Sequence, residues 1–428
     1  MINLIMLKIT KTNKYKIRCL FFIVLILFAT ELTGQQHCYD YLLLDGSEQL
    51  VTFGMDTTKN WWAITEPFSG NYRLTINGIA QKDYKEIRQL TFSPDGNHWA
   101  YFSRDNSQWY LNTNDTIIPL PGSDVGQIDY SPNSQKMAYS YFEGYDEIII
   151  IGEKRFREYQ RDFKSNPTIY LSQNAEKYAW VVKRGSGFAL NISGKETNVF
   201  DEILPIGFWY DGKMLYACRS FNLWEIYKGN ELISSNYSQV FEASINLKGN
   251  VAAVLVAQTG KQFAVLISDE YYEPLTGNRY DYVSNLILHP YLPMIAYNAN
   301  LYQNNLVVLN STEFAGGKEQ TGTPEFTYDG EELFFIGCDL HCFVNINGRK
   351  YPLNNEVSLD RYYAKKPGSN TIAYVTNTSM IVRDFEKEQL YSGMMVDNLV
   401  SPRYNWRNGV YEALGSINNR LYLLTCRF

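Results

Sequence analysis

Histidine is scarce in this 428-residue chain, and the common catalytic motifs are missing from it. The four histidines are His37, His98, His289 and His341. None of them belongs to an HExxH zinc motif, and no GxSxG nucleophile elbow occurs. The sequence therefore offers no motif for a zinc peptidase or an α/β-hydrolase, and we assign no catalytic residue, metal site or cofactor.

The chain begins with a hydrophobic run that is too short to span a bilayer. This run, Leu20 to Ala29, follows a basic region and has ten residues. As a helix it rises about 15 Å, roughly half of a hydrocarbon core. We therefore predict that residues 1–34 are a secretory signal peptide, with an uncleaved membrane anchor as the alternative. The mature chain would be exported to the periplasm, the cell envelope or the extracellular space, without a stable membrane span.

Clusters of positive charge are missing from the mature chain. The formal net charge is −6, and it becomes −10 without residues 1–34, which carry five of the 39 basic residues and one of the 45 acidic ones. No run rich in lysine or arginine remains. Nucleic acid and anionic membrane surfaces attract basic proteins, so neither is expected as a partner.

Helical periodicity is essentially absent, whereas aromatic residues are abundant. They make up 15% of the chain, including 34 tyrosines, and aromatic side chains pack well on half-buried pleated sheets. The stretch FSPDGNHWAYFS at 92–103 has the pattern of a strand end, a tight turn and a second strand. Both observations favour an all-β protein.

The turn at Asp95 has counterparts along the whole mature chain. Ten markers span 352 residues from the first to the last, so one repeat averages about 39 residues. Each marker is followed by a short apolar strand, such as HWAYFS or TIAYVT, in which a small residue, usually alanine, recurs. The markers are Asp56, Asp95, Asn133, Asn174, Asp211, Lys248, Tyr291, Asp329, Gly368 and Asn408.

Each repeat has room for four short strands joined by hairpin turns, which is the content of one propeller blade. We therefore predict a β-propeller of about ten four-stranded repeats over residues 35–428. The sequence leaves two arrangements open, a single large ring or two sub-propellers.

The turn motif resembles the TolB-like (WD40-like) β-propeller repeat, in which a Ser-Pro-Asp-Gly turn joins the innermost strand to the second. The match is close at residues 93–96 and partial at 131–134 and 328–330. Proline presets φ, and aspartate with glycine closes a tight turn, so the motif is structural. The resemblance implies a protein that binds a partner in the cell envelope.

The terminal segments indicate how the ring closes. Only two strands follow Asn408, whereas an extra strand at 39–44 precedes the first repeat. If this extra strand completes the last blade, antiparallel pairing places Cys38 beside Cys426. A disulfide between them would close a loop of nearly the whole chain.

Two further cysteines, Cys338 and Cys342, flank a three-residue loop and face each other across a hairpin. A disulfide, two free thiols and a metal site are the alternatives. The metal site is the weakest of these because the loop supplies at most three ligands. Export would permit both disulfides. Cys218 is left unpaired and is expected in the core.

Aromatic residues in the loops are the candidate binding residues. A propeller gathers loops from every blade onto two faces, where exposed aromatic rings can anchor a protein or stack on a sugar. We predict a non-catalytic protein-interaction scaffold with a protein partner. The candidates are Phe142, Tyr145, Phe221, Tyr271, Tyr272 and Tyr302.

The alternative is a carbohydrate-binding or glycoside-hydrolase-type propeller, with carbohydrate as the partner. A glycosidase would need two carboxyl groups roughly 5–10 Å apart in the central channel. The sequence shows acidic clusters in or beside turns, where carboxylates usually face solvent. They are Glu143 with Asp146 and Glu147, and Asp269 with Glu270.

Overall fold

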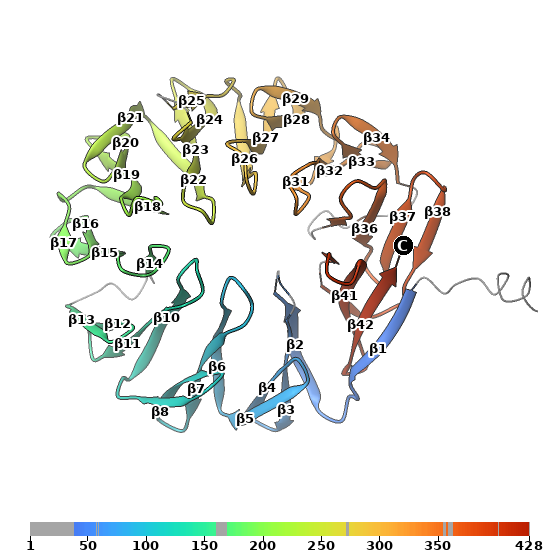
Figure 1. The fold of residues 1–428 in the computed structure, drawn as a ribbon, viewed down its shortest axis with the longest axis horizontal. Helices are drawn as coiled ribbons and strands as arrows, with labels where there is room; N and C mark the ends of the chain where they lie inside the picture. The colour runs from blue at the N-terminus through green and yellow to red at the C-terminus, as the bar shows by residue number, and fades with distance from the viewer. Residues whose placement is uncertain are drawn as a thin grey trace, which may run out of the picture.

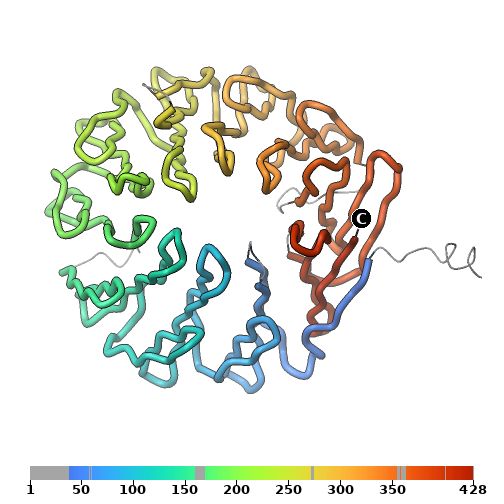
Figure 2. Tube along the Cα trace, viewed as in Figure 1, coloured from blue at the N-terminus to red at the C-terminus, as the bar shows by residue number. Residues whose placement is uncertain are grey.

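The computed structural model describes residues 38–427 except 57, 59, 160–168, 271–273, 354–356, 358–362 and 401. Ten antiparallel sheets follow one another around a central axis, and each is one blade of a β-propeller (Figure 1). Every regular element in these ranges is a strand, so the predicted all-β class is confirmed. The blades form one ring and not two sub-propellers (Figure 2). The predicted signal peptide, residues 1–34, lies outside the described residues.

Blades 1 to 9 use their strands in chain order, and the first of these strands lies nearest the axis (Figure 1). Blade 1 contains β2 (Gln49–Met55), β3 (Trp61–Phe68), β4 (Asn71–Ile76) and β5 (Ile79–Tyr84). Blade 2 contains β6 (Glu86–Phe92), β7 (Trp99–Asp105), β8 (Gln108–Thr113) and β9 (Ile117–Leu120). Blade 3 contains β10 (Asp124–Tyr130), β11 (Met137–Glu143), β12 (Asp146–Ile151) and β13 (Lys154–Glu158). Blade 4 contains β14 (Tyr170–Leu171), β15 (Tyr178–Arg184), β16 (Gly187–Ile192) and β17 (Lys195–Glu196). Blade 5 contains β18 (Glu202–Phe208), β19 (Met214–Ser220), β20 (Leu223–Lys228) and β21 (Glu231–Tyr237). Blade 6 contains β22 (Gln239–Ile245), β23 (Val251–Gln258), β24 (Lys261–Ser268) and β25 (Leu275–Thr276).

In blades 8 and 10 the strand nearest the axis is split in two. Blade 7 contains β26 (Tyr282–Leu288), β27 (Ile295–Leu301), β28 (Asn304–Leu309) and β29 (Thr312–Ala315). Blade 8 contains the split inner strand, β30 (Gln320–Thr321) and β31 (Glu325–Phe326), followed by β32 (Leu333–Cys338), β33 (Cys342–Ile346) and β34 (Arg349–Pro352). Blade 9 contains β35 (Ala364–Lys365), β36 (Thr371–Val375), β37 (Met380–Asp384) and β38 (Gln389–Ser392). Blade 10 contains the split inner strand, β39 (Asn398–Leu399) and β40 (Arg403–Asn405), followed by β41 (Val410–Ile417), β42 (Arg420–Arg427) and, as its outer strand, β1 (Cys38–Leu44).

The ring closes as the sequence predicts. Strand β1 pairs antiparallel with β42 and is the outer strand of blade 10, with Cys38 directly opposite Cys426. These two cysteines form a disulfide with a Cα–Cα distance of 4.0 Å. The chain is therefore joined at its ends by both a strand pair and a covalent bond.

The hydrophobic core is divided among the interfaces between blades. Each pair of neighbouring blades encloses its own cluster of buried side chains. The recurring alanine of the second strand is fully buried in eight blades, where its small side chain lets neighbouring sheets approach. These alanines are Ala63, Ala100, Ala138, Ala179, Ala253, Ala296, Ala373 and Ala413.

The Ser-Pro-Asp-Gly turn is held by its own side chains. Ser93 Oγ donates to Asp95 Oδ1 at 2.6 Å, and the same oxygen accepts from the backbone N–H of Asn97 at 3.0 Å. Gly96 has φ +67°, a conformation that glycine adopts without strain. The Ser131–Asn133 and Thr327–Asp329 pairs repeat the side-chain bond at 2.8 and 2.6 Å. The motif is structural, as predicted.

Antiparallel order places equivalent turns on one face. In every blade the turn between the second and third strands points to the same side as the link that leads to the next blade. We call this side the turn face. The opposite face carries the Ser-Pro-Asp-Gly turns and the turns between the third and fourth strands.

Candidate binding site

Three of the predicted binding residues lie at equivalent places on the turn face. Tyr145, Phe221 and Tyr302 occupy the turns between the second and third strands of blades 3, 5 and 7. Their side chains are 79%, 95% and 79% exposed. In blade 1, Phe68 is the last residue of the second strand, and in blade 8, Leu340 lies in the turn that follows it; they are 67% and 90% exposed. We call these five residues the apolar tips.

Two of the apolar tips hold an unfavourable backbone conformation. Phe221 and Tyr302 have φ values of +50° and +51°, and the residues after them, Asn222 and Gln303, are also left-handed. Such turns favour asparagine and glycine, because a bulky side chain in this region is strained. Blade 2 follows the usual pattern, with Asn106 at the corresponding position. Asparagine would suit this turn better, and the rings of Phe221 and Tyr302 are largely exposed.

Tyr302 is held by the link that leads into its own blade and by a lysine of blade 6. Its backbone N–H donates to Asp281 Oδ2 at 2.9 Å, and Lys261 Nζ lies 5.6 Å from the centre of its ring. Lys261 also forms an ion pair with Asp281, and this pair lowers the pKa of the carboxyl below its usual value. The exposed ring is thus presented from an ordered turn.

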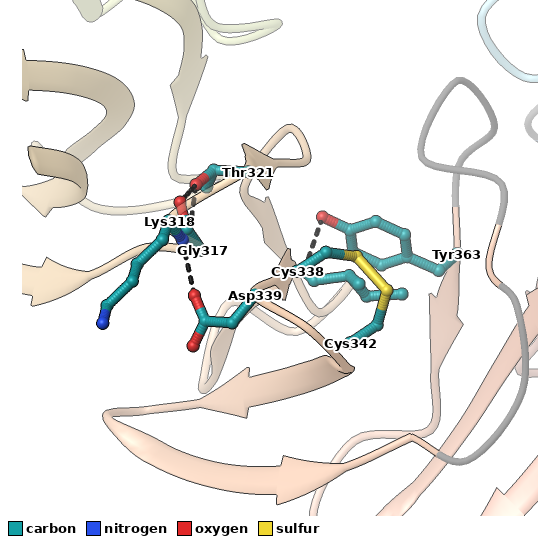
Figure 3. The surroundings of a disulfide bond; sticks show 8 residues. Gly317, Lys318, Thr321, Cys338, Asp339, Cys342 and Tyr363 are labelled. Carbon is teal, nitrogen blue, oxygen red and sulfur yellow. Dashed lines mark hydrogen bonds between the residues drawn. A yellow bond between two sulfur atoms is a disulfide. The ribbon is translucent and has the colours of Figure 1, made fainter. Parts of the chain in front are cut away.

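The tip that carries Leu340 is held by the second disulfide. Cys338 and Cys342 are bonded across the loop, with a Cα–Cα distance of 3.9 Å, so the disulfide alternative is the one present (Figure 3). The backbone N–H of Lys318 donates to Asp339 Oδ1 at 2.5 Å and ties the loop to the preceding link (Figure 3). Cys218 is free and buried, as expected.

The prediction that Phe142 is an exposed loop residue is wrong. Phe142 is 4% exposed, because β11 runs to Glu143 and leaves only Gly144 and Tyr145 in the turn. The backbone N–H of Ser123 donates to the carbonyl of Phe142 at 2.8 Å, so the incoming link covers this end of the strand. The candidates Tyr271 and Tyr272 lie outside the described residues.

Three carboxylates of the acidic clusters seen in the sequence, Glu143, Asp146 and Asp269, form ion pairs. Glu143 lies 2.8 Å from Arg155, and Asp146 lies 3.0 Å from Arg157, on the outer strand of blade 3. Asp269 accepts from Trp209 Nε1 and pairs with Lys228 at 3.1 Å. These carboxylates neutralise neighbouring cations and do not lie on the strands nearest the axis.

A cavity of about 630 Å³ lies among the inner strands of blades 1, 8, 9 and 10. Glu325, one of its lining residues, has a buried Oε1 without a hydrogen-bond partner among the described residues, and burial raises its pKa to about 8. Asp56 also lines the cavity, accepts from Thr58 and Asn60, and lies 3.5 Å from Arg403. Asp56 is thus held by hydrogen bonds and an ion pair, whereas the buried oxygen of Glu325 has no such partner in the described part of the chain.

The ten sheets, arranged one after another around a central axis, identify the fold of this protein. It is a ten-bladed β-propeller. No family model matches the sequence, and no curated protein matches it. Similar solved structures include a eukaryotic initiation factor, with 12% identity and a TM-score of 0.48 over 89% of this chain and 98% of that chain. The Dos1 propeller has 9% identity and a TM-score of 0.41, over 79% of this chain and 92% of that one.

TolB from Acinetobacter baumannii is also among the similar structures, with 12% identity and a TM-score of 0.31 over 61% of this chain and 76% of TolB. At such identities a likeness concerns the fold alone. The TolB-like resemblance of the repeats agrees with the structure at that level.

Sequence reasoning missed a polar hollow between blades 7 and 8. It has a volume of about 370 Å³, and its lining includes Asn300 and Asn305, which lie on either side of the turn that carries Tyr302. A signal was available: in the aligned strands of the repeat, Asn298 stands where blade 2 has Phe102. The lining includes Tyr282, Ser284, Asn298, Asn300, Asn305 and Gln320.

The described part of the chain offers neither a metal-binding cluster nor a membrane-spanning helix. It contains no group of three or more His, Cys, Asp or Glu side chains arranged to hold a metal ion. It also contains no helix that is long and apolar enough to cross a membrane.

Proposed function

We propose that this chain is an exported, non-catalytic scaffold that binds a protein partner in the cell envelope through its turn face. The observation that carries the proposal is the pair of strained, exposed aromatic residues Phe221 and Tyr302. Strain that benefits neither the turn nor the core is a reason to look for a function. Exposed aromatic side chains are the residues that most often anchor protein interfaces.

The spacing of the apolar tips supports a large partner. Tyr145, Phe221 and Tyr302 belong to blades 3, 5 and 7, so they are spread over half of the ring. A ligand that touches several of them must cover several blades, as a folded protein does.

The two disulfides support an exported location. Structural disulfides form and persist in oxidising compartments and are rare in the cytosol. The bonds Cys38–Cys426 and Cys338–Cys342 use four of the five cysteines in the described residues. The basic and apolar character of residues 1–34 points the same way.

A pull-down from native cell envelope tests the proposal. Purified residues 36–428 serve as bait, beside a variant with Tyr145→Ser, Phe221→Asn and Tyr302→Asn. We expect the wild-type chain to retain a stoichiometric protein and the triple variant to lose it.

The matched control changes two apolar residues on the opposite face. Ile79 and Ile117 are 68% and 51% exposed and begin fourth strands of blades 1 and 2. The variant with Ile79→Asn and Ile117→Asn should retain the partner. Equal capture by the triple variant, or loss of capture by the control, would show that the turn face is not the binding surface.

A further inference from the structure

Blade 7 turns an unusually polar surface toward blade 8. Directly opposite residues of an antiparallel pair share one face, and the pairs Tyr282–Asn300, Ser284–Asn298 and Asn300–Asn305 bring five polar side chains together. Asn298 Nδ2 lies 3.2 Å from the carbonyl oxygen of Gly322, which belongs to blade 8. The face therefore points into the interface between the blades.

This surface differs from the interface between blades 2 and 3 in a way that costs stability. Phe102, at the position equivalent to Asn298 in blade 2, is fully buried in the cluster shared with blade 3. Asn298 does not fill the corresponding space, and its Oδ1 is buried without a partner among the described residues. A buried acceptor without a donor costs free energy, so packing alone does not account for asparagine here.

The polar hollow is built for hydrogen bonding and not for charge. Its lining contains amides, hydroxyls and one carboxylate, Glu319, and no lysine or arginine. Ser284, Asn285 and Gln320 add side chains that make no hydrogen bond to another described residue. The half-exposed ring of Tyr282 forms one wall. The volume of about 370 Å³ lies within the range of small-molecule sites, roughly 300–1,000 Å³.

We propose that this hollow binds a neutral saccharide. Sugar hydroxyls both donate and accept, so they match a lining that mixes amide and hydroxyl groups. An aromatic ring such as Tyr282 offers an apolar face on which a pyranose ring stacks. An anionic ligand would meet Glu319 without any cation to offset it, and calcium sites in proteins usually draw on several carboxylates.

The site is independent of the proposed protein-binding function. None of the five apolar tips lines the hollow. Loss of the saccharide site and loss of partner capture are therefore separable by mutation.

The test is titration calorimetry of residues 36–428 with neutral malto-, cello-, xylo- and chito-oligosaccharides at up to millimolar concentration. We expect at least one series to bind. Asn298→Phe, which places the blade-2 residue in the hollow, should weaken that binding on the order of tenfold or more, and Gln320→Ala and Tyr282→Ala should each weaken it too. Tyr41→Ala is the matched control, since Tyr41 is 54% exposed on β1 and Tyr282 is 56% exposed.

Three results would overturn the proposal. They are the absence of binding to every oligosaccharide, binding that survives both Asn298→Phe and Tyr282→Ala, and a thermal shift by calcium chloride alone that Asn298→Phe removes. If Asn298→Phe fails to fold, the Gln320→Ala and Tyr282→Ala variants decide the question, because both side chains lie at the exposed mouth of the hollow.

Discussion

Phe221 and Tyr302 occupy the same position in two blades, the first residue of the turn between the second and third strands, and both have a left-handed φ near +50°. Their rings are 95% and 79% exposed. The turn would be more stable with asparagine at this position, which blade 2 has in Asn106. The stability of the turn therefore favours asparagine at these two positions, yet the chain has an exposed aromatic residue at each.

This conflict predicts a trade between stability and binding. Phe221→Asn and Tyr302→Asn should leave the free energy of unfolding unchanged or raise it by up to about 1 kcal/mol each, because asparagine tolerates the left-handed region. Both variants should bind the envelope partner more weakly. Urea unfolding and pull-down of the same preparations measure the two effects. Destabilisation by both substitutions would mean that the aromatic rings support the turn.

The ring-closing disulfide should matter more than the loop disulfide. Cys38 and Cys426 are 388 residues apart, whereas Cys338 and Cys342 are four apart. The entropy removed from the unfolded chain grows with loop length, so Cys38→Ser with Cys426→Ser should cost about 6 kcal/mol and the Cys338→Ser, Cys342→Ser pair about 2 kcal/mol. Unfolding of the two double variants in urea compares them. Equal costs would argue against closure of the ring as the source of stability.

Glu325 should make the protein less stable in alkaline solution. Its pKa is raised from 4.5 to about 8 in the folded chain, mainly by burial. With respect to Glu325, the folded chain is therefore most stable below the unfolded pKa of 4.5. It loses this stability as the pH rises through the folded pKa of about 8, because the buried carboxyl group must then ionise. Glu325→Gln should therefore be nearly neutral below about pH 4.5 and should stabilise by on the order of 2–4 kcal/mol above about pH 8.

Asp129 provides the control for that pH profile. Burial raises its pKa from 3.8 to about 6, so the effect of Asp129→Asn should be complete at a lower pH than that of Glu325→Gln. Thermal unfolding across the pH range measures both variants. A Glu325→Gln variant whose stability falls with pH in parallel with the wild type would contradict the assignment.

The ion pair of Lys365 with Glu332 is buried and should be sensitive to the loss of one partner. Their atoms lie 2.6 Å apart, and the Lys365 side chain is fully buried. Glu332→Gln leaves a buried ammonium without its carboxylate and should cost about 3 kcal/mol or more. Glu202→Gln breaks the exposed pair with Arg219, at 2.6 Å, and should cost less than about 1 kcal/mol. Chemical denaturation of the two variants checks the difference.

Most of the fold could be predicted because its signals are local. The turn at Asp95, the buried alanine of each second strand and the extra strand at the N-terminus all appear in the sequence itself. They led to the blade content, the closure and the Cys38–Cys426 bond, which the structure confirms.

The sites could be predicted only in part, because they depend on where strands end and on how blades pack. The sequence predicts Phe142 in a loop, whereas β11 continues to Glu143 and Phe142 is buried. The alignment of turns that unites Tyr145, Phe221 and Tyr302 requires the strand boundaries. The polar hollow depends on contacts between Asn298 and another blade, which no short stretch of sequence displays.

Photo-cross-linking in intact cells tests the central claim most directly. A photoreactive phenylalanine analogue is placed at position 221, at position 302, or at position 117 on the opposite face. The account predicts that positions 221 and 302 yield the same protein adduct and that position 117 yields none. An adduct from position 117 alone, or different adducts from positions 221 and 302, would contradict a single partner bound across the turn face.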